Sequence, residues 1–394
     1  MAADAELHVL MTADCVGGVW THALELAGAL GRRGVRVTLA SLGARLTPHQ
    51  RAAAACVPSL DLHESAWRLE WMDDPWDDVR AAGEWLLALE RAVRPDVLHL
   101  NQFSFGALPF GAPKLVVAHS CVLSWWQAVR GAGAPRRYDT YRGAVTAGLE
   151  GAALVAAPTR SMLASLASHY GAHWQGAAIH NGRDPAAFAA GRKQPVILSA
   201  GRLWDDARNL AALEAVAPYL PWPVRVSGSA VHPCGGRRQL HGVEPLGELT
   251  AEALAAQFAA ASIYALPARY EPFGQTALEA AFSGCALVLG DIPSLREIWG
   301  AAALYVPPDD HDALHEALTR LIEQPELRTA MGQRARLRAG RFTPQRMADG
   351  YLRTYRWLLG NRRRETQHTY AHRAAQVEAL PEGPDAARKT KALA

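Results

Sequence analysis

Two carboxylates flank a short turn in the stretch from Ala268 to Asp291, ARYEPFGQTALEAAFSGCALVLGD, and they could hold one ligand at two points. Glu271 precedes a Pro-Phe-Gly-Gln-Thr turn, and Glu279 lies one turn into the helix that this turn opens. Gly274 lets the backbone approach a ligand closely, and unpaired amides at a helix start favour an anion. The stretch therefore predicts either a phosphate site between two hydroxyl-binding carboxylates or an ordinary helix start with acidic residues in its first turn.

A second group of candidate residues lies in the loop GRLWDDAR, which follows an apolar, strand-like run. Arg202 and Arg208 flank this loop. Guanidinium groups bind phosphate oxygens in forks and keep their charge, so the two side chains could neutralise a diphosphate. The alternative is a surface ion pair with Asp205 or Asp206.

The first half of the chain contributes a histidine and a glycine pair. His119 ends the apolar run PKLVVAHS, where open α/β sheets place their ligand sites. Gly17 and Gly18 open a predicted helix and could direct their amides to a phosphate or a sugar. A structural histidine and a tight turn are the alternatives. The dinucleotide fingerprint G-x-G-x-x-G is absent here, which argues against an NAD or FAD enzyme.

Three tryptophans are candidates for binding an acceptor. Trp125 and Trp126 follow His119 closely and could stack on a sugar ring or another flat group. They could equally cover the helix that they start. We assign Trp20 to the same candidate acceptor site.

Alternating strands and helices must position these residues. The run LHVLMT, the glycine turn, a helix over 19–32 and the run VRVTLA form one βαβ unit. Similar units recur about every 25 to 30 residues through both halves, which predicts an α/β chain with two doubly wound parallel sheets. Thr159 and Thr250 have the positions of helix N-caps.

Composition shifts suggest where these units divide. The run AFAAGRKQP reads as a linker near residue 190, and the chain turns helical after Asp310. A helix predicted over 343–360 carries Tyr351 and Tyr355, enough apolar surface to pack against another element. Residues 361–394 are polar, carry an arginine triplet at 362–364 and are predicted to form a flexible tail.

Whole-chain properties exclude several classes of protein. The 394 residues, 49% hydrophobic and 20% charged, suit a soluble protein with two cores. A net charge of +3 argues against nucleic acid as a partner. The N-terminus lacks the basic region of a signal peptide, and no apolar run is long enough to span a membrane. Five scattered cysteines without a CxxC pair favour a reduced, cytoplasmic protein with no structural zinc site.

Taken together, the motifs resemble those of the retaining glycosyltransferases of family 4. The segment from Glu271 to Glu279 matches that family's E-x7-E motif in spacing and context. Three features that precede it occur in the same order as in the family: the Gly17-Gly18 loop, the strand-end His119 and the Gly201-Arg202-Leu203 loop. The resemblance covers roughly residues 7 to 360. It implies the GT-B architecture, in which two Rossmann-like domains face a cleft and a C-terminal helix crosses back to the first domain.

The resemblance also implies domain roles. Residues 1–190 would form the acceptor-binding domain, 191–342 the nucleotide-sugar-binding domain, 343–360 the crossover helix and 361–394 the tail. No pyridoxal or other cofactor is expected, and no D-x-D metal site is evident, so transfer should need no metal.

Site residues carry over by position in this sequence. Arg202 and Arg208 would neutralise the donor diphosphate, although the family usually has lysine, commonly five residues after the arginine, where this chain has Arg208. Glu271 would bind donor-sugar hydroxyls, and His119 would lie against the transferred sugar. The remaining expected donor contacts are Gly17, Gly18, Gly247, Leu249, Phe273, Gly274, Gln275, Thr276 and, for the ribose, Glu279.

The sequence therefore predicts a retaining transferase that moves a hexose, glucose as the first guess, from a UDP-sugar to a small-molecule or glycan hydroxyl. A soluble acceptor is favoured over a membrane lipid because the charges of the first half are nearly balanced. The alternatives are a nucleotide-sugar epimerase of the same architecture and a binding protein without turnover. The sequence argues against a phosphorylase, which needs a lysine to bind pyridoxal, because Lys114 and Lys193 are the only lysines before the tail.

Overall fold

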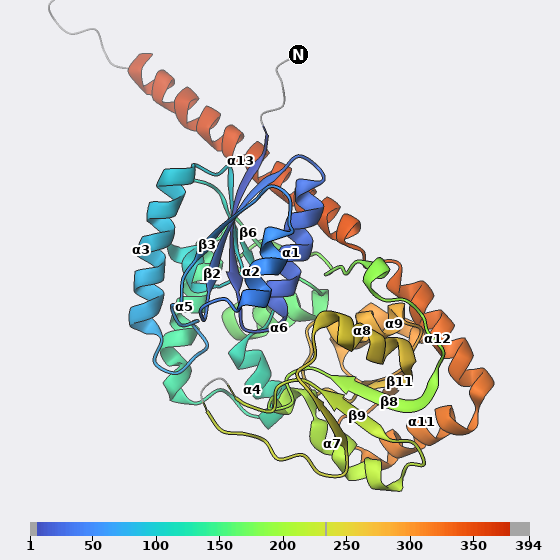
Figure 1. Cartoon of the computed structure of the whole chain (residues 1–394). Helices are drawn as coiled ribbons and strands as arrows, with labels where there is room; N and C mark the ends of the chain where they lie inside the picture. The colour runs from blue at the N-terminus through green and yellow to red at the C-terminus, as the bar shows by residue number, and fades with distance from the viewer. Residues whose placement is uncertain (1–5, 233–234, 379–394) are drawn as a thin grey trace, which may run out of the picture.

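The computed structural model describes residues 6–232 and 235–378, and in these it has two parallel sheets, each with helices on both faces (Figure 1). The first sheet has seven strands in the order β3-β2-β1-β4-β5-β6-β7. Their bounds are β1 His8–Asp14, β2 Arg36–Leu42, β3 Leu60–Glu64, β4 Val97–Leu100, β5 Lys114–Val117, β6 Leu154–Ala157 and β7 Gly176–Ala178.

Six helices and part of a seventh cover the first sheet. Their bounds are α1 Gly18–Gly31, α2 Pro48–Ala55, α3 Trp76–Val93, α4 Val122–Arg130, α5 Asp139–Glu150 and α6 Arg160–Tyr170. Apolar side chains of α1 and α2 pack on one face and those of α3 to α6 on the other. Every residue of β1 is therefore buried, as expected for a strand covered on both faces.

The second sheet has six parallel strands in the order β10-β9-β8-β11-β12-β13. Their bounds are β8 Gln194–Ala200, β9 Val224–Ser227, β10 Glu244–Gly247, β11 Ala261–Leu266, β12 Ala286–Gly290 and β13 Leu304–Val306. The helices around it are α7 Leu210–Val216, α8 Ala251–Ala260, α9 Gln275–Phe282, α10 Pro293–Trp299, α11 His311–Glu323 and α12 Pro325–Ala339. The predicted pair of doubly wound parallel sheets is confirmed.

Two of the predicted helix caps are also confirmed. The Thr159 hydroxyl accepts a hydrogen bond from the Met162 amide at the start of α6, and the Thr250 hydroxyl accepts one from the Ala253 amide at the start of α8. Each satisfies an amide that lacks a partner within its helix. Both caps are local, because donor and acceptor lie three residues apart.

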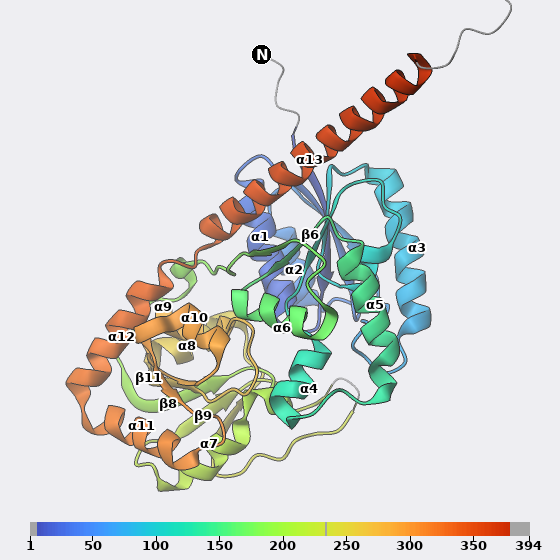
Figure 2. The same ribbon diagram turned by 180° about the vertical axis from the view of Figure 1, so that it is seen from behind.

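The last helix, α13 (Pro344–Glu378), returns to the first domain and packs against α1 (Figures 1 and 2). Tyr351 and Tyr355 are buried in the core of the first domain, beside the residues of β1. The predicted crossover is thus present, but the tail prediction was wrong for 361–378. The arginines, glutamates and glutamines of this segment favour a helix that continues one already begun. Residues 379–394 lie outside the described residues.

Candidate active site

A cavity of about 680 Å³ lies where the carboxyl ends of strands from both sheets face one another. Its walls come from the loops after β1 and β5 in the first domain and after β8, β9 and β11 in the second. Such a crevice is where open α/β sheets bind their ligands. The predicted site residues that line it are Gly17, Gly18, His119, Arg202, Arg208, Leu249, Glu271, Phe273, Gln275, Thr276 and Glu279.

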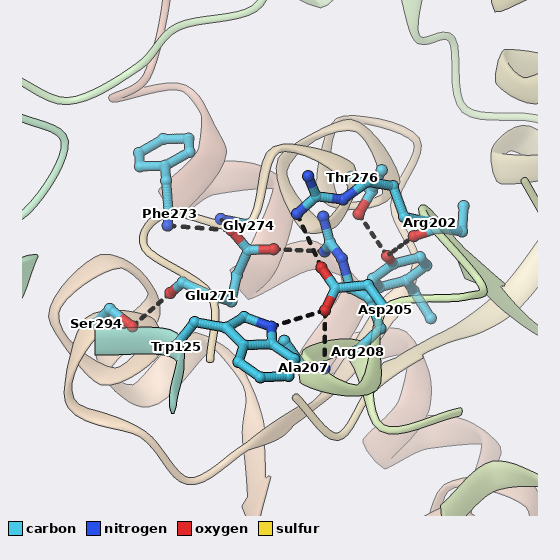
Figure 3. A network of polar contacts seen from close by, with 12 residues as sticks. Trp125, Arg202, Asp205, Ala207, Arg208, Glu271, Phe273, Gly274, Thr276 and Ser294 are labelled. Carbon is cyan, nitrogen blue, oxygen red and sulfur yellow. Dashed lines mark hydrogen bonds and ion pairs between the residues drawn. The ribbon is translucent and has the colours of Figure 1, made fainter. Parts of the chain in front are cut away.

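The start of α9 is built by short-range interactions. Gly274 is the N-cap and has a φ of 86°, a left-handed conformation that glycine adopts without penalty. One oxygen of Glu271 accepts hydrogen bonds from the amides of Phe273 at 3.3 Å and Gly274 at 2.9 Å, and the Ser294 hydroxyl donates to the Glu271 carbonyl at 2.5 Å (Figure 3). The amides that we predicted to face a sugar therefore hold the Glu271 carboxylate in place.

Arg208 forms an ion pair with the other oxygen of Glu271 (Figure 3). Burial works against the charge on Arg208, but the carboxylates of Glu271 and Asp205 outweigh it and raise the pKa of the guanidinium above its ordinary value. Gly201, with a φ of 144°, passes close to this side chain, since a Cβ there would lie 3.3 Å from Arg208 Cζ. A fixed positive charge therefore sits beside the carboxylate at the cavity wall.

Arg202 is held by a carboxylate that also connects the two domains. Its Nη2 donates to Asp205 Oδ2 at 2.9 Å, and Trp125 Nε1 of α4 donates to Asp205 Oδ1 at 2.9 Å (Figure 3). Next to this contact, Arg130 pairs with Asp206 at 2.7 Å. Trp125, which we expected to face an acceptor, thus donates its indole hydrogen bond to a residue of the second domain.

Glu279 forms a buried ion pair that the sequence analysis missed. Arg183 Nε lies 2.8 Å from Glu279, and Arg183 Nη1 lies 2.6 Å from Glu25 of α1. Burial raises the pKa of both carboxyl groups, and Arg183 opposes that shift. The predicted ribose-binding carboxylate is therefore already bound to a cation. No local signal marks Arg183, because its partners lie 96 and 158 residues away.

His119 reaches the cavity from the end of β5, and its Nε2 lies 2.7 Å from Asn101 Oδ1. Burial lowers the pKa of His119 to about 4, so the ring is neutral at physiological pH. His22 of α1 packs against it edge-on at 4.6 Å between ring centroids. His119 therefore faces the cavity as a neutral imidazole.

Asp14 is a second group that the sequence analysis did not single out. It ends β1 and accepts a hydrogen bond from the Val16 amide at 2.6 Å, just before the glycine pair. Burial raises the pKa of Asp14 to about 7, while the Val16 amide and Arg202 oppose that shift. The carboxyl group therefore titrates nearer neutral pH than an ordinary aspartate, beside the loop that faces the second domain.

Several predicted residues have other neighbours than expected. The Thr276 hydroxyl bonds to the Tyr264 hydroxyl at 2.6 Å, and Gly247 ends β10 without lining the cavity. Trp20 is buried in the core of the first domain, and Trp126 packs on Tyr138. Of the three tryptophans proposed for an acceptor, none lines the cavity.

Neither a metal-binding cluster nor a membrane-spanning helix occurs among the described residues. Over residues 6–232 and 235–378, no three histidine, cysteine or acidic side chains come together in a way that could hold a metal ion. Among the helices described there, none has the length and apolar character needed to cross a bilayer.

Family models match most of the chain. The model described as Glycosyltransferase Family 4 matches residues 16–187, and the model described as Glycosyl transferases group 1 matches residues 182–338. The chain belongs to glycosyltransferase family 4. Members of this family are transferase enzymes, and the predicted family is confirmed.

Named relatives of this family 4 member are similar over short segments. It is 35% identical over 104 residues to D-inositol 3-phosphate glycosyltransferase of Saccharomonospora viridis, which is 25% of this chain and 23% of that protein. It is 29% identical over 113 residues to O-antigen chain mannosyltransferase B of Escherichia coli, which is 29% of this chain and 30% of that protein. The alignments thus span less than a third of either relative.

Solved structures resemble the chain over nearly its whole length. Sucrose-phosphate synthase from Thermosynechococcus elongatus has a TM-score of 0.74 at 19% identity and covers 90% of this chain and 100% of its own. HepE from Anabaena, in complex with UDP-glucose, has a TM-score of 0.70 at 14% identity and covers 88% and 99%. At such identities the likeness concerns the fold alone, and it confirms the GT-B architecture.

Proposed function

We propose that this family 4 member is a retaining glycosyltransferase that moves a hexose from a nucleotide sugar to an acceptor hydroxyl. The observation that carries the proposal is the convergence of Arg202, Arg208 and the amide end of α9 on one side of the cavity. Two guanidinium groups and a helix start suit a diphosphate, which carries several negative charges. Gly17 and Gly18 of the first domain line the same cavity, and Gly18 lies beside Gln275, the first residue of α9.

UDP-glucose is the first donor to test. The structural neighbour HepE is known in complexes with UDP and with UDP-glucose, which supports a UDP-sugar here. In our assignment the domain of residues 191–342 binds the nucleotide sugar, and the domain of residues 1–190 binds the acceptor. The helix over residues 343–360 joins the two. The acceptor is a small molecule or glycan rather than a membrane lipid, and the four cysteines described as free fit a reducing, cytoplasmic setting.

The chemistry that we propose is electrostatic. The bond between the anomeric carbon and the phosphate oxygen breaks, and the acceptor oxygen attacks from the same face. The proton of the acceptor hydroxyl passes to the leaving phosphate. Arg202, Arg208 and the positive end of α9 stabilise the negative charge that develops on the diphosphate. No protein nucleophile and no metal ion are needed for this sequence of events.

The ion pairs of the structure prepare these groups for the donor. Glu271 holds Arg208, and Asp205 holds Arg202, so neither guanidinium has to be ordered when the diphosphate arrives. Glu271 can still accept a hydrogen bond from a donor-sugar hydroxyl, since a carboxylate has about four lone-pair sites. Glu279 would bind the ribose while Arg183 maintains its charge.

A two-stage experiment tests the proposal. Thermal shift or calorimetry first compares UDP-, GDP- and ADP-sugars, and we expect stabilisation by a UDP-sugar. Transfer to a panel of hydroxyl acceptors is then measured with and without EDTA, and full activity with EDTA is expected. Strict dependence on Mg²⁺ or Mn²⁺ would refute the metal-independent mechanism. Conversion of the donor sugar without an acceptor would point to an epimerase, and binding without any turnover to a non-catalytic nucleotide-sugar-binding protein.

A further inference from the structure

The environment of His119 contains a buried chain of hydrogen bonds that runs from the cavity to the last helix of the protein. It links His119 of the loop after β5, Asn101 and His99 of β4 and its following loop, and Tyr355 of α13. The nitrogen Nε2 of His119 lies 2.7 Å from Asn101 Oδ1, His99 Nε2 lies 3.2 Å from the same oxygen, and His99 Nδ1 lies 2.6 Å from the Tyr355 hydroxyl.

The orientation of the Asn101 side chain decides where the hydrogens lie. Its Nδ2 donates to the Thr12 carbonyl at 2.6 Å, and its backbone amide donates to the Thr12 hydroxyl at 2.9 Å. A flipped amide would set two oxygens against each other. Oδ1 therefore points to the two histidines, and an amide oxygen can only accept. Both His119 and His99 must carry a proton on Nε2.

The remaining hydrogen bond of this series, between His99 and Tyr355, is compatible only with this arrangement. A neutral imidazole with a proton on Nε2 has a bare Nδ1. For His99 that atom accepts the hydroxyl hydrogen of Tyr355, so each contact joins one donor to one acceptor. The His99 and Tyr355 side chains are fully buried, where an unpaired polar atom would be costly.

The state of the rings supports the same assignment. Burial lowers the pKa of His99 to about 3 and that of His119 to about 4. The titratable groups that face His119 are His99 from β4 and His22 from α1, and the pKa of His22 is also lowered by burial. Among the residues that the structure describes, no carboxylate acts on the His119 ring to favour a second proton.

What remains is the second nitrogen of His119. Within the described part of the chain, His119 Nδ1 makes no hydrogen bond. It is also not one of the fully buried polar atoms without a partner, so part of its surface is exposed. It therefore keeps access to the cavity that the ring lines.

We propose that Asn101, His99 and Tyr355 are positioning residues that lock His119 as the Nε2–H tautomer, so that its Nδ1 meets the substrate as a hydrogen-bond acceptor. This inference rests on the proposed function for the identity of the substrate. A bare Nδ1 selects a hydroxyl that can donate a hydrogen, and it disfavours a carboxylate or phosphate oxygen at the same place. The crossover helix α13 thereby supports the substrate contact of a loop in the first domain.

The tautomer can be measured without substrate. In ¹⁵N-histidine-labelled full-length protein, protonated and bare ring nitrogens give well separated signals, and loss of a signal in His119→Gln assigns the ring. We expect Nε2 protonated and Nδ1 bare at pH 7. A proton on Nδ1, alone or together with Nε2, would overturn the proposal whether or not the protein transfers a sugar. The stated tautomer in a protein that uses no nucleotide sugar would refute only the proposed function.

Variants of Asn101 separate positioning from folding. Asn101→Leu keeps the size but removes the acceptor, so we expect mixed His119 tautomers and a fall in kcat/KM of about 10- to 100-fold. Asn101→Asp keeps an acceptor for the Nε2 proton, but its second oxygen faces the Thr12 carbonyl, so we expect the buried carboxyl to be protonated and to donate to that carbonyl as the amide does. The His119 tautomer and the activity of this variant should therefore stay close to those of the wild type. Unchanged tautomer and activity in Asn101→Leu would contradict the proposal.

Two tyrosines one turn apart on α13 provide a matched pair. Tyr355→Phe removes the hydroxyl bonded to His99, and we expect a fall in kcat of about 3- to 10-fold together with a shifted His99 Nδ1 signal. Tyr351→Phe is the control. Tyr351 is similarly buried and its ring lies 4.9 Å from His99, but its hydroxyl takes no part in the series of hydrogen bonds between His119 and Tyr355. Equal effects of the two variants on kcat and on the His99 signal would show that the hydroxyl has no role.

Discussion

Replacing Arg183 by methionine tests how the two domains are held at the base of the cavity. The guanidinium bridges Glu25 of the first domain and Glu279 of the second, and the exposed fractions of the three side chains are 12%, 19% and 9%. Methionine approximates the length of the arginine stem but leaves two carboxylates without their cation. The perturbation is therefore loss of a buried charge rather than loss of packing.

The expected loss follows from the burial of the partners. Removing one member of a buried ion pair typically costs about 3 to 5 kcal/mol, because the remaining charge stays desolvated. At pH 7.5 we expect the free energy of unfolding to fall by about 3 kcal/mol, which for a domain of this size lowers Tm by about 6 to 12 °C.

The loss must depend on pH in a defined direction. Burial already raises the pKa of Glu25 and Glu279 above 4.5, and removal of Arg183 raises both further. The folded variant then binds more protons than the unfolded chain, so its stability decreases as the pH rises through the folded-state pKa values. The deficit should be largest at pH 8 and shrink towards pH 5.

Urea unfolding at pH 5, 6.5 and 8 measures this dependence for the wild type and for Arg183→Met. Arg225→Met, which removes an exposed partner of Glu244, is the matched control and should change stability little at any pH. Adding Glu25→Gln and Glu279→Gln to Arg183→Met should recover most of the loss. A deficit that is absent, or equal at pH 5 and pH 8, would refute the reasoning.

Three further predictions concern the site itself. Glu271→Ala should lower kcat by about 10²- to 10³-fold in a protein that still folds, although its Tm should also fall because Arg208 loses its buried partner; near-normal transfer would remove Glu271 from the mechanism. Gly274→Ala places a Cβ at a φ of 86° and 3.1 Å from Leu295 Cδ2, so unfolding in urea should show a loss of about 1 to 2 kcal/mol. Asp14→Asn should stabilise the protein above pH 7, because the raised pKa of Asp14, about 7, makes wild-type stability decrease as the pH rises through that value; equal pH profiles of the two proteins in urea would contradict this.

Several features were predictable because they depend on short stretches of chain. The caps at Thr159 and Thr250 join atoms three residues apart, and Glu271 finds the Gly274 amide over the same distance. The repeated strand-helix pattern likewise follows from local periodicity, since each apolar run must be buried between helices. The two sheets and the turn before α9 could therefore be predicted from the sequence.

Other residues have partners that the sequence did not indicate, because a neighbouring element lies against them. Trp125 looked suited to stacking on an acceptor, but the domains approach closely enough for its indole to bind Asp205. The segment 361–378 looked like a flexible tail by composition, but it continues α13, whose first turns are anchored by packing against α1. Composition does not report such neighbours.

The fold class and the residues that face the cavity from α9 could be predicted from the sequence, because the patterns that indicate them lie within short stretches of chain. The charge state and the hydrogen-bond partners of the site could not, because they depend on contacts between distant parts of the folded chain. Arg183 meets Glu279 and Glu25 across 96 and 158 residues, and Tyr355 meets His99 across 256. Buried polar groups must find partners wherever the fold places them, and no local pattern in the sequence encodes that distance.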